Sequence, residues 1–217
     1  MLELLIKVLL SYLLGSLLGS VLLGRFADVD VRATGSGNPG ATNALRARGW
    51  KFALGVLLID VLKAVIAVVL VAHVPWPWAG AADGASLAWL APACGAAAVI
   101  GHVWPLYHRL RGGKGAATLL GAVAVLMPAA LVPMLVVWLG GAIATGYVGI
   151  STIAAAVAVP LFVLLWQGAA LSSPPAVFAV AMAALMVFTH RENLVRMWRG
   201  EEHCFESFKI WRKLLRG

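Results

Sequence analysis

The sequence predicts an all-α, polytopic membrane protein with seven transmembrane helices, built as a single domain over residues 1–217. Its composition is 62% hydrophobic and only 12% charged, about half the charged fraction of a soluble domain. Several apolar runs approach the roughly 20 residues that a helix needs to cross a bilayer. The runs lack the alternation of polar and apolar residues that a membrane β-barrel shows, which favours helices.

Proline, glycine and charged residues set the ends of the expected helices. The first run is too long and too uniformly apolar for a signal peptide, so we interpret it as a retained helix. In the second half, Pro128 and Pro133 mark one bend, and Gly140-Gly141 with Gly146 mark another. The fourth span is short, so it is expected to tilt or to enter the bilayer only partway. The predicted spans are 2–23, 52–72, 85–104, 115–128, 130–146, 149–167 and 174–190.

The basic residues predict the orientation. Of the 17 Lys and Arg residues, all but Lys7 and Lys63 fall between the first and second spans, between the third and fourth, or after the seventh. The opposite loops, 73–84, 168–173 and the turn near residue 129, contain none. Positive charge marks the cytoplasmic side of a membrane protein. The N-terminus is therefore expected outside and the C-terminus in the cytoplasm.

Three polar blocks lie on this cytoplasmic side, and each adjoins an apolar span. Block one is residues 35–43 (GSGNPGATN), block two is residues 111–115 (RGGKG), and block three is residues 190–196 (HRENLVR). Each places small, amide or imidazole residues near Arg or Lys, which is the chemistry of phosphate binding. Such groups at the water boundary predict a phosphorylated, lipid-related substrate.

Block one formally matches the dinucleotide fingerprint G-x-G-x-x-G at Gly35, Gly37 and Gly40. The fingerprint needs a βαβ unit, which does not fit a membrane helix followed by this loop. The glycines still let backbone N–H groups approach an anion, and a plain interfacial turn is the alternative. Polar donors and cations accompany them: Ser36, Asn38, Thr42, Asn43, Arg46 and Arg48.

Block two resembles half a P-loop, with Gly112, Gly113 and Gly115 around Lys114. It lacks the first glycine and the adjacent Lys-Ser/Thr pair of the full motif, so nucleotide hydrolysis is not the favoured function. A helix N-terminus after the glycines is a good anion site, and a loop that only anchors topology is the alternative. His102, just upstream, can orient the block.

In block three, His190, Asn193 and either Arg196 or Met197 recur at a spacing of three to four residues and share one helix face. Glu192 and Arg196 are four residues apart and can pair. A lone interfacial His is usually structural, but this one has amide and guanidinium neighbours. Within the second span, Asp60 and Lys63 are expected to neutralise each other as an i, i+3 pair, because unpaired charges in a bilayer are costly.

Other chemistries lack support in the sequence. No cluster of His, Cys or carboxylates has metal-ligand spacing, and no G-x-S-x-G elbow is present, so neither a metal nor another cofactor is expected. No pattern indicates a nucleic-acid partner or a particular oligomeric state. The cytoplasmic loops hold few carboxylates able to act as a base, which suits a substrate that arrives already activated.

Together the three blocks resemble the motifs of the bacterial acyl-phosphate:glycerol-3-phosphate acyltransferases, the PlsY family. The family motifs have the forms G-S-G-N-x-G-A-T-N-x-x-R, G-H-x-x-P followed by F-K-G-G-K-G-x-A-T, and H-R-x-N-I-x-R-L-x-x-G-x-E. Their order and separation match over essentially the whole chain. The corresponding stretches are Gly35 to Arg46, Gly101 to Pro105 with Leu110 to Thr118, and His190 to Glu202.

The resemblance implies transfer of a fatty acyl group from acyl phosphate to glycerol 3-phosphate, giving lysophosphatidic acid and phosphate in phospholipid biosynthesis. It also implies a multi-pass protein of the bacterial inner membrane whose active site faces the cytoplasm. We expect one cationic pocket with Lys114 and Arg196 as phosphate binders. The expected catalytic residues are Ser36, Asn38, Arg46, Lys114, His190 and Asn193. The expected substrate-binding residues are Gly37, Gly40, Thr42, Asn43, His102, Arg111, Gly112, Gly113, Gly115, Ser151, Arg196 and Glu202.

The chain departs from the family pattern at two places. Leu110-Arg111 replaces Phe-Lys in block two, which keeps the charge. The family has a serine-containing stretch after a tyrosine, which here reads YVGIST over residues 147–152. Gly149 stands at the expected first serine, so Ser151 is taken as the stand-in.

Two other functions stay open at this point. A transporter for an organic phosphate would explain the cations and the helices, although it is expected to place polar residues near the midplane. A membrane subunit without catalysis, whose basic loops bind anionic lipid, is the other. For an acyltransferase, His190 acting as base and the substrate phosphate taking the proton are equally open.

Overall fold

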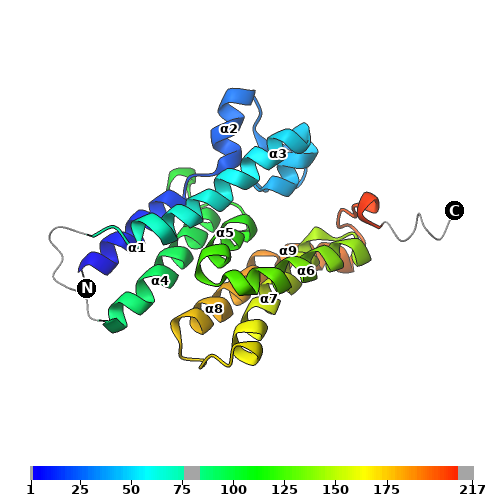
Figure 1. Cartoon of the computed structure of the whole chain (residues 1–217). Coiled ribbons are helices and arrows are strands. Elements are labelled where there is room, and N and C mark those ends of the chain that lie inside the picture. The colour runs from blue at the N-terminus through cyan, green and yellow to red at the C-terminus, as the bar shows by residue number, and fades with distance from the viewer. Residues whose placement is uncertain (1, 76–83, 210–217) are drawn as a thin grey trace. The chain divides into compact units, whose positions relative to one another are not determined.

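A computed structural model describes residues 2–75 and 84–209 (Figure 1). Within these residues the chain forms helices and no strand, as predicted. Two compact units are present, Met1–Leu126 (unit 1) and Met127–Gly217 (unit 2), and the single-domain prediction stays a prediction. Most of the predicted loop 73–84 and the basic residues after 209 lie outside the described residues.

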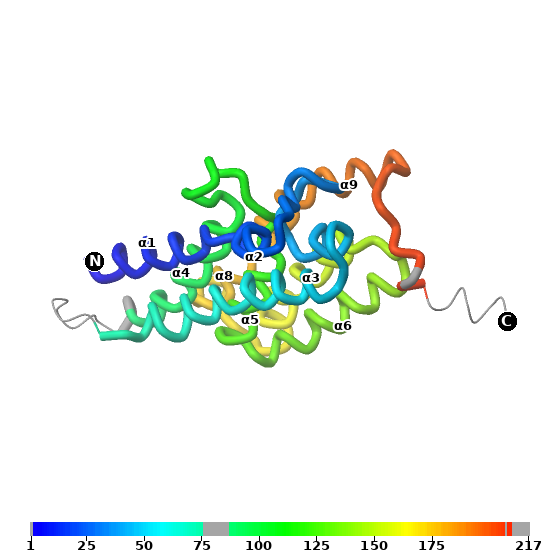
Figure 2. Tube along the Cα trace, turned by 90° about the horizontal axis from the view of Figure 1, so that it is seen from above, coloured from blue at the N-terminus to red at the C-terminus, as the bar shows by residue number. Residues whose placement is uncertain are grey.

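Unit 1 is built on close helix pairs, in which α1 lies along α4 and α3 lies along α5 (Figures 1 and 2). A Cβ on Gly15 would lie 2.1 Å from the carbonyl oxygen of Ala98, and a Cβ on Gly121 would lie 2.3 Å from that of Val61. Small residues let membrane helices approach in this way. The elements are α1 (Leu2–Gly15), α2 (Gly19–Ala27), η1 (Val31–Ala33), α3 (Ala41–Ile66), η2 (Ala67–Val71), α4 (Gly84–Val103), η3 (Leu106–His108) and α5 (Ala116–Leu126).

The first predicted span is two helices rather than one, because α1 ends at Gly15 and α2 begins at Gly19. Two polar groups at this break have partners on α3. The carbonyl oxygen of Leu17 accepts from Lys63 Nζ at 2.8 Å, and the N–H of Gly19 donates to Asp60 Oδ1 at 3.2 Å. Asp60 and Lys63 also pair at 2.9 Å, which confirms the predicted neutralisation.

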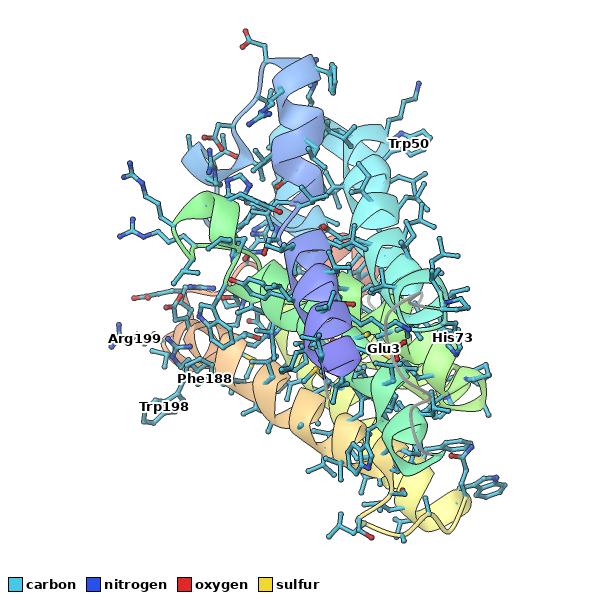
Figure 3. All side chains as sticks on the ribbon, turned by 90° about the vertical axis from the view of Figure 1, so that its left-hand side faces the viewer. Glu3, Trp50, His73, Phe188, Trp198 and Arg199 are labelled. Atoms are coloured by element: carbon cyan, nitrogen blue, oxygen red, sulfur yellow. The ribbon has the colours of Figure 1, made fainter. Side chains whose placement is uncertain are left out.

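The second predicted span starts earlier than expected, at the N-terminus of α3. The helix is kinked at Arg48 and Gly49, where Gly49 has a φ of +80°. The segment before the kink holds the end of block one, and the apolar run begins only after it. The run therefore marks the second part of α3 alone. Trp50 projects from the surface just beyond the kink (Figure 3).

Unit 2 packs α7 against both α6 and α8. Pro128 begins α6, and Gly146 ends it with a φ of +74°, so two of the predicted break points are helix ends. Pro133 and the Gly140-Gly141 pair lie inside α6. The elements are α6 (Pro128–Thr145), α7 (Val148–Leu161), η4 (Phe162–Trp166), α8 (Pro174–Thr189), α9 (Arg191–Trp198) and η5 (Glu206–Phe208).

Five helical segments of the described residues are long and apolar enough to cross a membrane, or six if α8 and α9, bent by 46°, form one span. The helix α5, predicted as the short fourth span, has only 11 residues. The structure thus agrees with a helical, multi-span membrane protein. The count of seven spans and the orientation of the termini stay predictions.

Candidate functional site

Block one forms a tight loop between α2 and α3. Gly35 and Gly37 have φ values of +55° and +70°, which glycine adopts at little cost. Gly40 is the N-cap of α3, and its carbonyl accepts from the N–H groups of Asn43 and Ala44. The loop therefore delivers the polar residues of block one directly onto a helix N-terminus, where backbone N–H groups favour anions.

Asn43 holds this loop from inside. Its Nδ2 donates to the carbonyl oxygens of Val31 and Thr34, both at 2.9 Å, and its Oδ1 accepts from the N–H of Ser36 at 3.1 Å. The side chain is buried, and a Cβ on Gly35 would lie 2.3 Å from its Oδ1. The amide of Asn43 thus fixes the backbone that presents Ser36.

Block two is a second loop, between α4 and α5. It turns through Arg109 and Leu110, both with positive φ, and through Gly115 at +88°. Its backbone is tied to the end of α4, because the N–H of Gly112 donates to Val103 O at 3.1 Å and that of Gly113 to His102 O at 3.0 Å. The helix α5 begins immediately after Gly115.

The two loops line one cleft of about 580 Å³ within unit 1. Block one contributes Gly37 and block two contributes Arg111 and Gly112, so three predicted substrate-binding residues meet there. Two further arginines line it, and no strong motif signal marked them beyond their basic charge. The full lining is Arg32, Gly37, Pro39, Tyr107, His108, Arg109, Arg111 and Gly112.

Arg32 is oriented in this cleft by Asp30. The guanidinium donates twice to the carboxylate, through Nε and Nη2, each at 2.9 Å. The side-chain hydrogen bond from Arg32 is the main reason that the pKa of the Asp30 carboxyl lies below its usual range. The remaining lining residues carry no carboxylate, so the cleft as a whole is electropositive.

The other predicted residues of unit 1 differ in their exposure. Ser36 and Arg46 are exposed, and Asn38 and Lys114 are half-buried. His102 is buried behind the loop of block two. The exposed and half-buried side chains are accessible to solvent, whereas the side chain of His102 is not.

Block three spans the bend between α8 and α9 in unit 2. His190 caps the junction, and its Nδ1 lies 2.9 Å from the carbonyl oxygen of Met186. A carbonyl can only accept, so Nδ1 donates to it. The hydroxyl of Thr189 lies 3.2 Å from the same nitrogen, so the imidazole is held at Nδ1.

Glu202 joins two further polar residues of block three. Its Oε1 accepts from Asn193 Nδ2 and its Oε2 from Arg196 Nε, both at 2.8 Å. Glu192, the partner expected from the sequence, lies 3.9 Å from the Arg196 guanidinium and is largely exposed. Glu202 is thus the closer partner, and it fixes the amide and the guanidinium on one side of α9.

Gly149, not Ser151, lies against block three. A Cβ on Gly149 would be 2.8 Å from Asn193 Cβ. The hydroxyl of Ser151 donates to Tyr147 O at 2.8 Å and faces Gly141 of α6. Residues two apart on a helix point to different faces, so Ser151 does not replace a side chain at 149.

No group of three or more His, Cys, Asp or Glu side chains able to hold a metal ion occurs among residues 2–75 and 84–209. The positively charged loops instead offer guanidinium, ammonium and backbone N–H groups. These are donors, and they match phosphate oxygens.

Comparison with known families gives a match over residues 5–200 to the model described as glycerol-3-phosphate acyltransferase. A glycerol-3-phosphate acyltransferase of Cronobacter sakazakii is 38% identical over 193 residues, covering 88% of this chain and 84% of the relative. One from Halalkalibacterium halodurans is 39% identical over 186 residues, covering 84% and 85%.

Two solved structures have the same fold. The glycerol 3-phosphate form of PlsY, an integral membrane glycerol 3-phosphate acyltransferase, matches with a TM-score of 0.78 and 32% identity, covering 96% of this chain and 98% of that one. The lysophosphatidic acid form of PlsY matches with a TM-score of 0.75 and 33% identity, covering 93% and 94%.

Proposed function

The chain belongs to the glycerol-3-phosphate acyltransferase family, and we propose that it transfers a fatty acyl group from acyl phosphate to glycerol 3-phosphate. The products are lysophosphatidic acid and inorganic phosphate, at the first acylation of phospholipid synthesis. The solved PlsY structures, one a glycerol 3-phosphate form and one a lysophosphatidic acid form, support an acceptor and a product of this kind.

The observation that carries the proposal is the electropositive cleft between blocks one and two. Arg32, Arg109 and Arg111 line it together with the backbone of Gly37 and Gly112. Arginine and exposed glycine backbone suit the oxygens of a phosphate dianion. Acyl phosphate and glycerol 3-phosphate are both anionic, and bringing them together requires this kind of charge.

The reaction needs no cofactor from this chain. An acyl phosphate is a mixed anhydride, so phosphate is a good leaving group. The hydroxyl oxygen of glycerol 3-phosphate forms a bond to the carbonyl carbon, and the bond from that carbon to the phosphate oxygen breaks. Catalysis then rests on alignment and on stabilising the negative charge of the carbonyl oxygen and the leaving phosphate.

We assign Lys114, Arg46 and Arg196 to charge stabilisation, and Ser36, Asn38 and Asn193 to orientation by hydrogen bonds. The roles of Lys114 and Arg196 as phosphate binders rest on their charge and on their positions in blocks two and three. The contact of Glu202 with Asn193 and Arg196 supports a shared function for that pair.

The proton of the attacking hydroxyl has two possible acceptors. One is Nε2 of His190, which keeps its lone pair when Nδ1–H faces Met186 O. The other is the departing phosphate itself, which fits the scarcity of carboxylates around the cleft. Replacing His190 by Gln separates them, because loss of a protein base removes the acidic limb of the pH–rate profile, whereas a phosphate acceptor leaves that limb in place.

We place the enzyme in the bacterial inner membrane, with seven spans, the N-terminus outside and the active site facing the cytoplasm. The one-sided distribution of Lys and Arg supports this orientation. A cysteine introduced at Ser36 and one at Arg199 should both react with a membrane-impermeant maleimide only from the cytoplasmic side.

The donor is tested with the full-length protein reconstituted in bilayers. Labelled glycerol 3-phosphate is offered with palmitoyl phosphate or with palmitoyl coenzyme A, and lysophosphatidic acid is scored. We expect product with palmitoyl phosphate only. Product with palmitoyl coenzyme A alone would overturn the donor, and uptake of label into vesicles without product would favour the transporter.

A further inference from the structure

A second group of charged side chains lies inside unit 1, away from the cleft surface. Asp60, Lys63 and His102 have exposed fractions of 0%, 3% and 2%. Lys63 Nζ lies 2.9 Å from Asp60 Oδ1 and 2.7 Å from His102 Nδ1. The three side chains therefore form one buried network between α3 and α4.

The network has a defined direction of hydrogen bonding. An ammonium has three protons and only donates, and Lys63 has three acceptors: Leu17 O, Asp60 Oδ1 and His102 Nδ1. With Lys63 charged, His102 Nδ1 accepts from it, which leaves the proton of the neutral ring on Nε2. The same Nδ1 also lies 3.4 Å from Asp60 Oδ1, so Lys63 and Asp60 together hold the Nδ1 edge of the imidazole.

The Nε2 edge of His102 lies against block two. A Cβ built on Gly113 would be 2.1 Å from Nε2 and 3.0 Å from the two adjacent ring carbons. The carbonyl of His102 also accepts from the N–H of Gly113 at 3.0 Å. Gly113 precedes Lys114, so the ring fixes the backbone that carries this lysine.

Asp60 and Lys63 satisfy the Gly19 N–H and the Leu17 carbonyl at the α1–α2 break, but that role does not account for the contact of Lys63 with His102. Buried ion pairs often contribute no more stability than apolar residues of the same volume. Among the described residues, Asp60 Oδ2 has no hydrogen-bond partner. The buried carboxylate therefore has hydrogen bonds at only one of its two oxygens. Such a network is expected where it fixes a functional group.

We propose that Asp60, Lys63 and His102 are positioning residues, which act through Gly113 to hold Lys114 in the geometry needed for catalysis. This inference rests on the proposed acyl transfer. It gives His102 a supporting role behind the loop, where its side chain is buried, rather than contact with substrate.

A double-mutant cycle tests the contact through which the network acts. The activity is kcat/KM for glycerol 3-phosphate, measured with palmitoyl phosphate on full-length protein in bilayers. Gly113→Ala should reduce it by about 100-fold, because a shift of 1 Å at a positioned group has that effect. In a His102→Ala background the added methyl has space, so Gly113→Ala should reduce kcat/KM by less than about threefold. If the fold-losses of kcat/KM in the two single variants multiply in the double variant, the two positions are not coupled and the proposal is wrong.

A pair of neutral variants tests the buried charges. Asp60→Asn with Lys63→Met keeps side-chain volume and removes both charges. The matched control is Glu3→Gln with Lys7→Met, another pair in unit 1 that includes a buried lysine, at 2.7 Å. We expect kcat/KM to fall at least about tenfold further in the first variant than in the control. Equal activity in the two would contradict positioning.

A conservative replacement separates positioning from folding. Gln at position 102 keeps a side-chain N–H near the place of Nε2, so His102→Gln should retain more kcat/KM than His102→Ala at a similar Tm. Equal activities would overturn the proposal. If the wild-type protein makes no lysophosphatidic acid, the proposed function fails first, which distinguishes that result from failure of the network alone.

Discussion

The loops of unit 1 and the helix of unit 2 present their functional groups in opposite ways. Blocks one and two use glycines at positive φ and loops tied to neighbouring backbone, as at Gly35, Gly37 and Gly115. Block three lies on regular helix at the α8–α9 bend, and Glu202 orients its side chains. The loops thus depend on backbone conformation, whereas block three depends on the contacts of its side chains with neighbouring residues.

The largest effect should come from removing one group from each unit. Lys114→Ala is expected to lower kcat by on the order of 100- to 1,000-fold, as for other groups that stabilise transition-state charge, and Asn193→Ala by about 100-fold, because Asn193 orients the reacting groups. Turnover of labelled glycerol 3-phosphate measures this, and an unchanged Tm shows that the protein is folded. Near-normal turnover in both variants would show that neither Lys114 nor Asn193 is needed for catalysis.

Added bulk next to block three should have the next largest effect. Gly149→Ala places a Cβ 2.8 Å from Asn193 Cβ, so the amide must move, and we expect about a 100-fold loss of kcat/KM. Gly140→Ala is the matched control, because a Cβ there meets nothing within 4 Å. Equal activity of the two variants would show that the place of Asn193 does not matter.

Loss of the orienting carboxylate should have a smaller effect. Glu202→Gln weakens the contacts at 2.8 Å to Asn193 and Arg196, and about a tenfold loss of kcat/KM is expected for a charge-assisted hydrogen bond. Glu192→Gln removes a carboxylate 3.9 Å from the same guanidinium, on a largely exposed side chain. It should leave kcat/KM unchanged, and a similar loss in both would rule out a specific role for Glu202.

The smallest effect concerns the Asp30–Arg32 pair at the cleft. The pKa of Asp30 is lowered in the folded protein, so the pair stabilises the fold above the ordinary carboxyl pKa of 3.8 and loses this contribution as the pH falls through the lowered value. The side chains are 50% and 41% exposed, which limits the gain to a few tenths of a kcal/mol. Asp30→Asn should thus lower Tm slightly at pH 7, and this loss should shrink as the pH falls through the lowered pKa of Asp30. A loss of Tm that does not shrink at acid pH would contradict the pairing.

Sequence patterns predicted the helices well where apolar runs end at proline or glycine. Pro128 and Gly146 bound α6, because these residues act locally on the backbone. The break after Gly15 escaped detection, since its polar groups are satisfied by Asp60 and Lys63 from a distant part of the chain. Local patterns carry no information about such partners.

The residues of the functional site were likewise predictable only where local sequence patterns identify them. The glycines and cations of the three blocks were evident from their spacing, because phosphate binding needs those residue types. The cleft residues Arg32 and Arg109 were counted only as topology signals, and Glu202 rather than Glu192 is the close partner of Arg196. Each depends on how the chain folds back, which spacing along the sequence does not encode.

The most direct test of the proposed reaction follows one oxygen atom. Palmitoyl phosphate labelled with ¹⁸O in the oxygen that bridges the acyl carbon and phosphorus is incubated with glycerol 3-phosphate and the reconstituted protein, and all products are analysed by mass spectrometry. Acyl transfer at the carbonyl carbon breaks the bond from that carbon to the bridging oxygen, so it predicts ¹⁸O in the released phosphate and none in the ester of lysophosphatidic acid. Label retained in palmitate, or phosphate release without the ester, would contradict it.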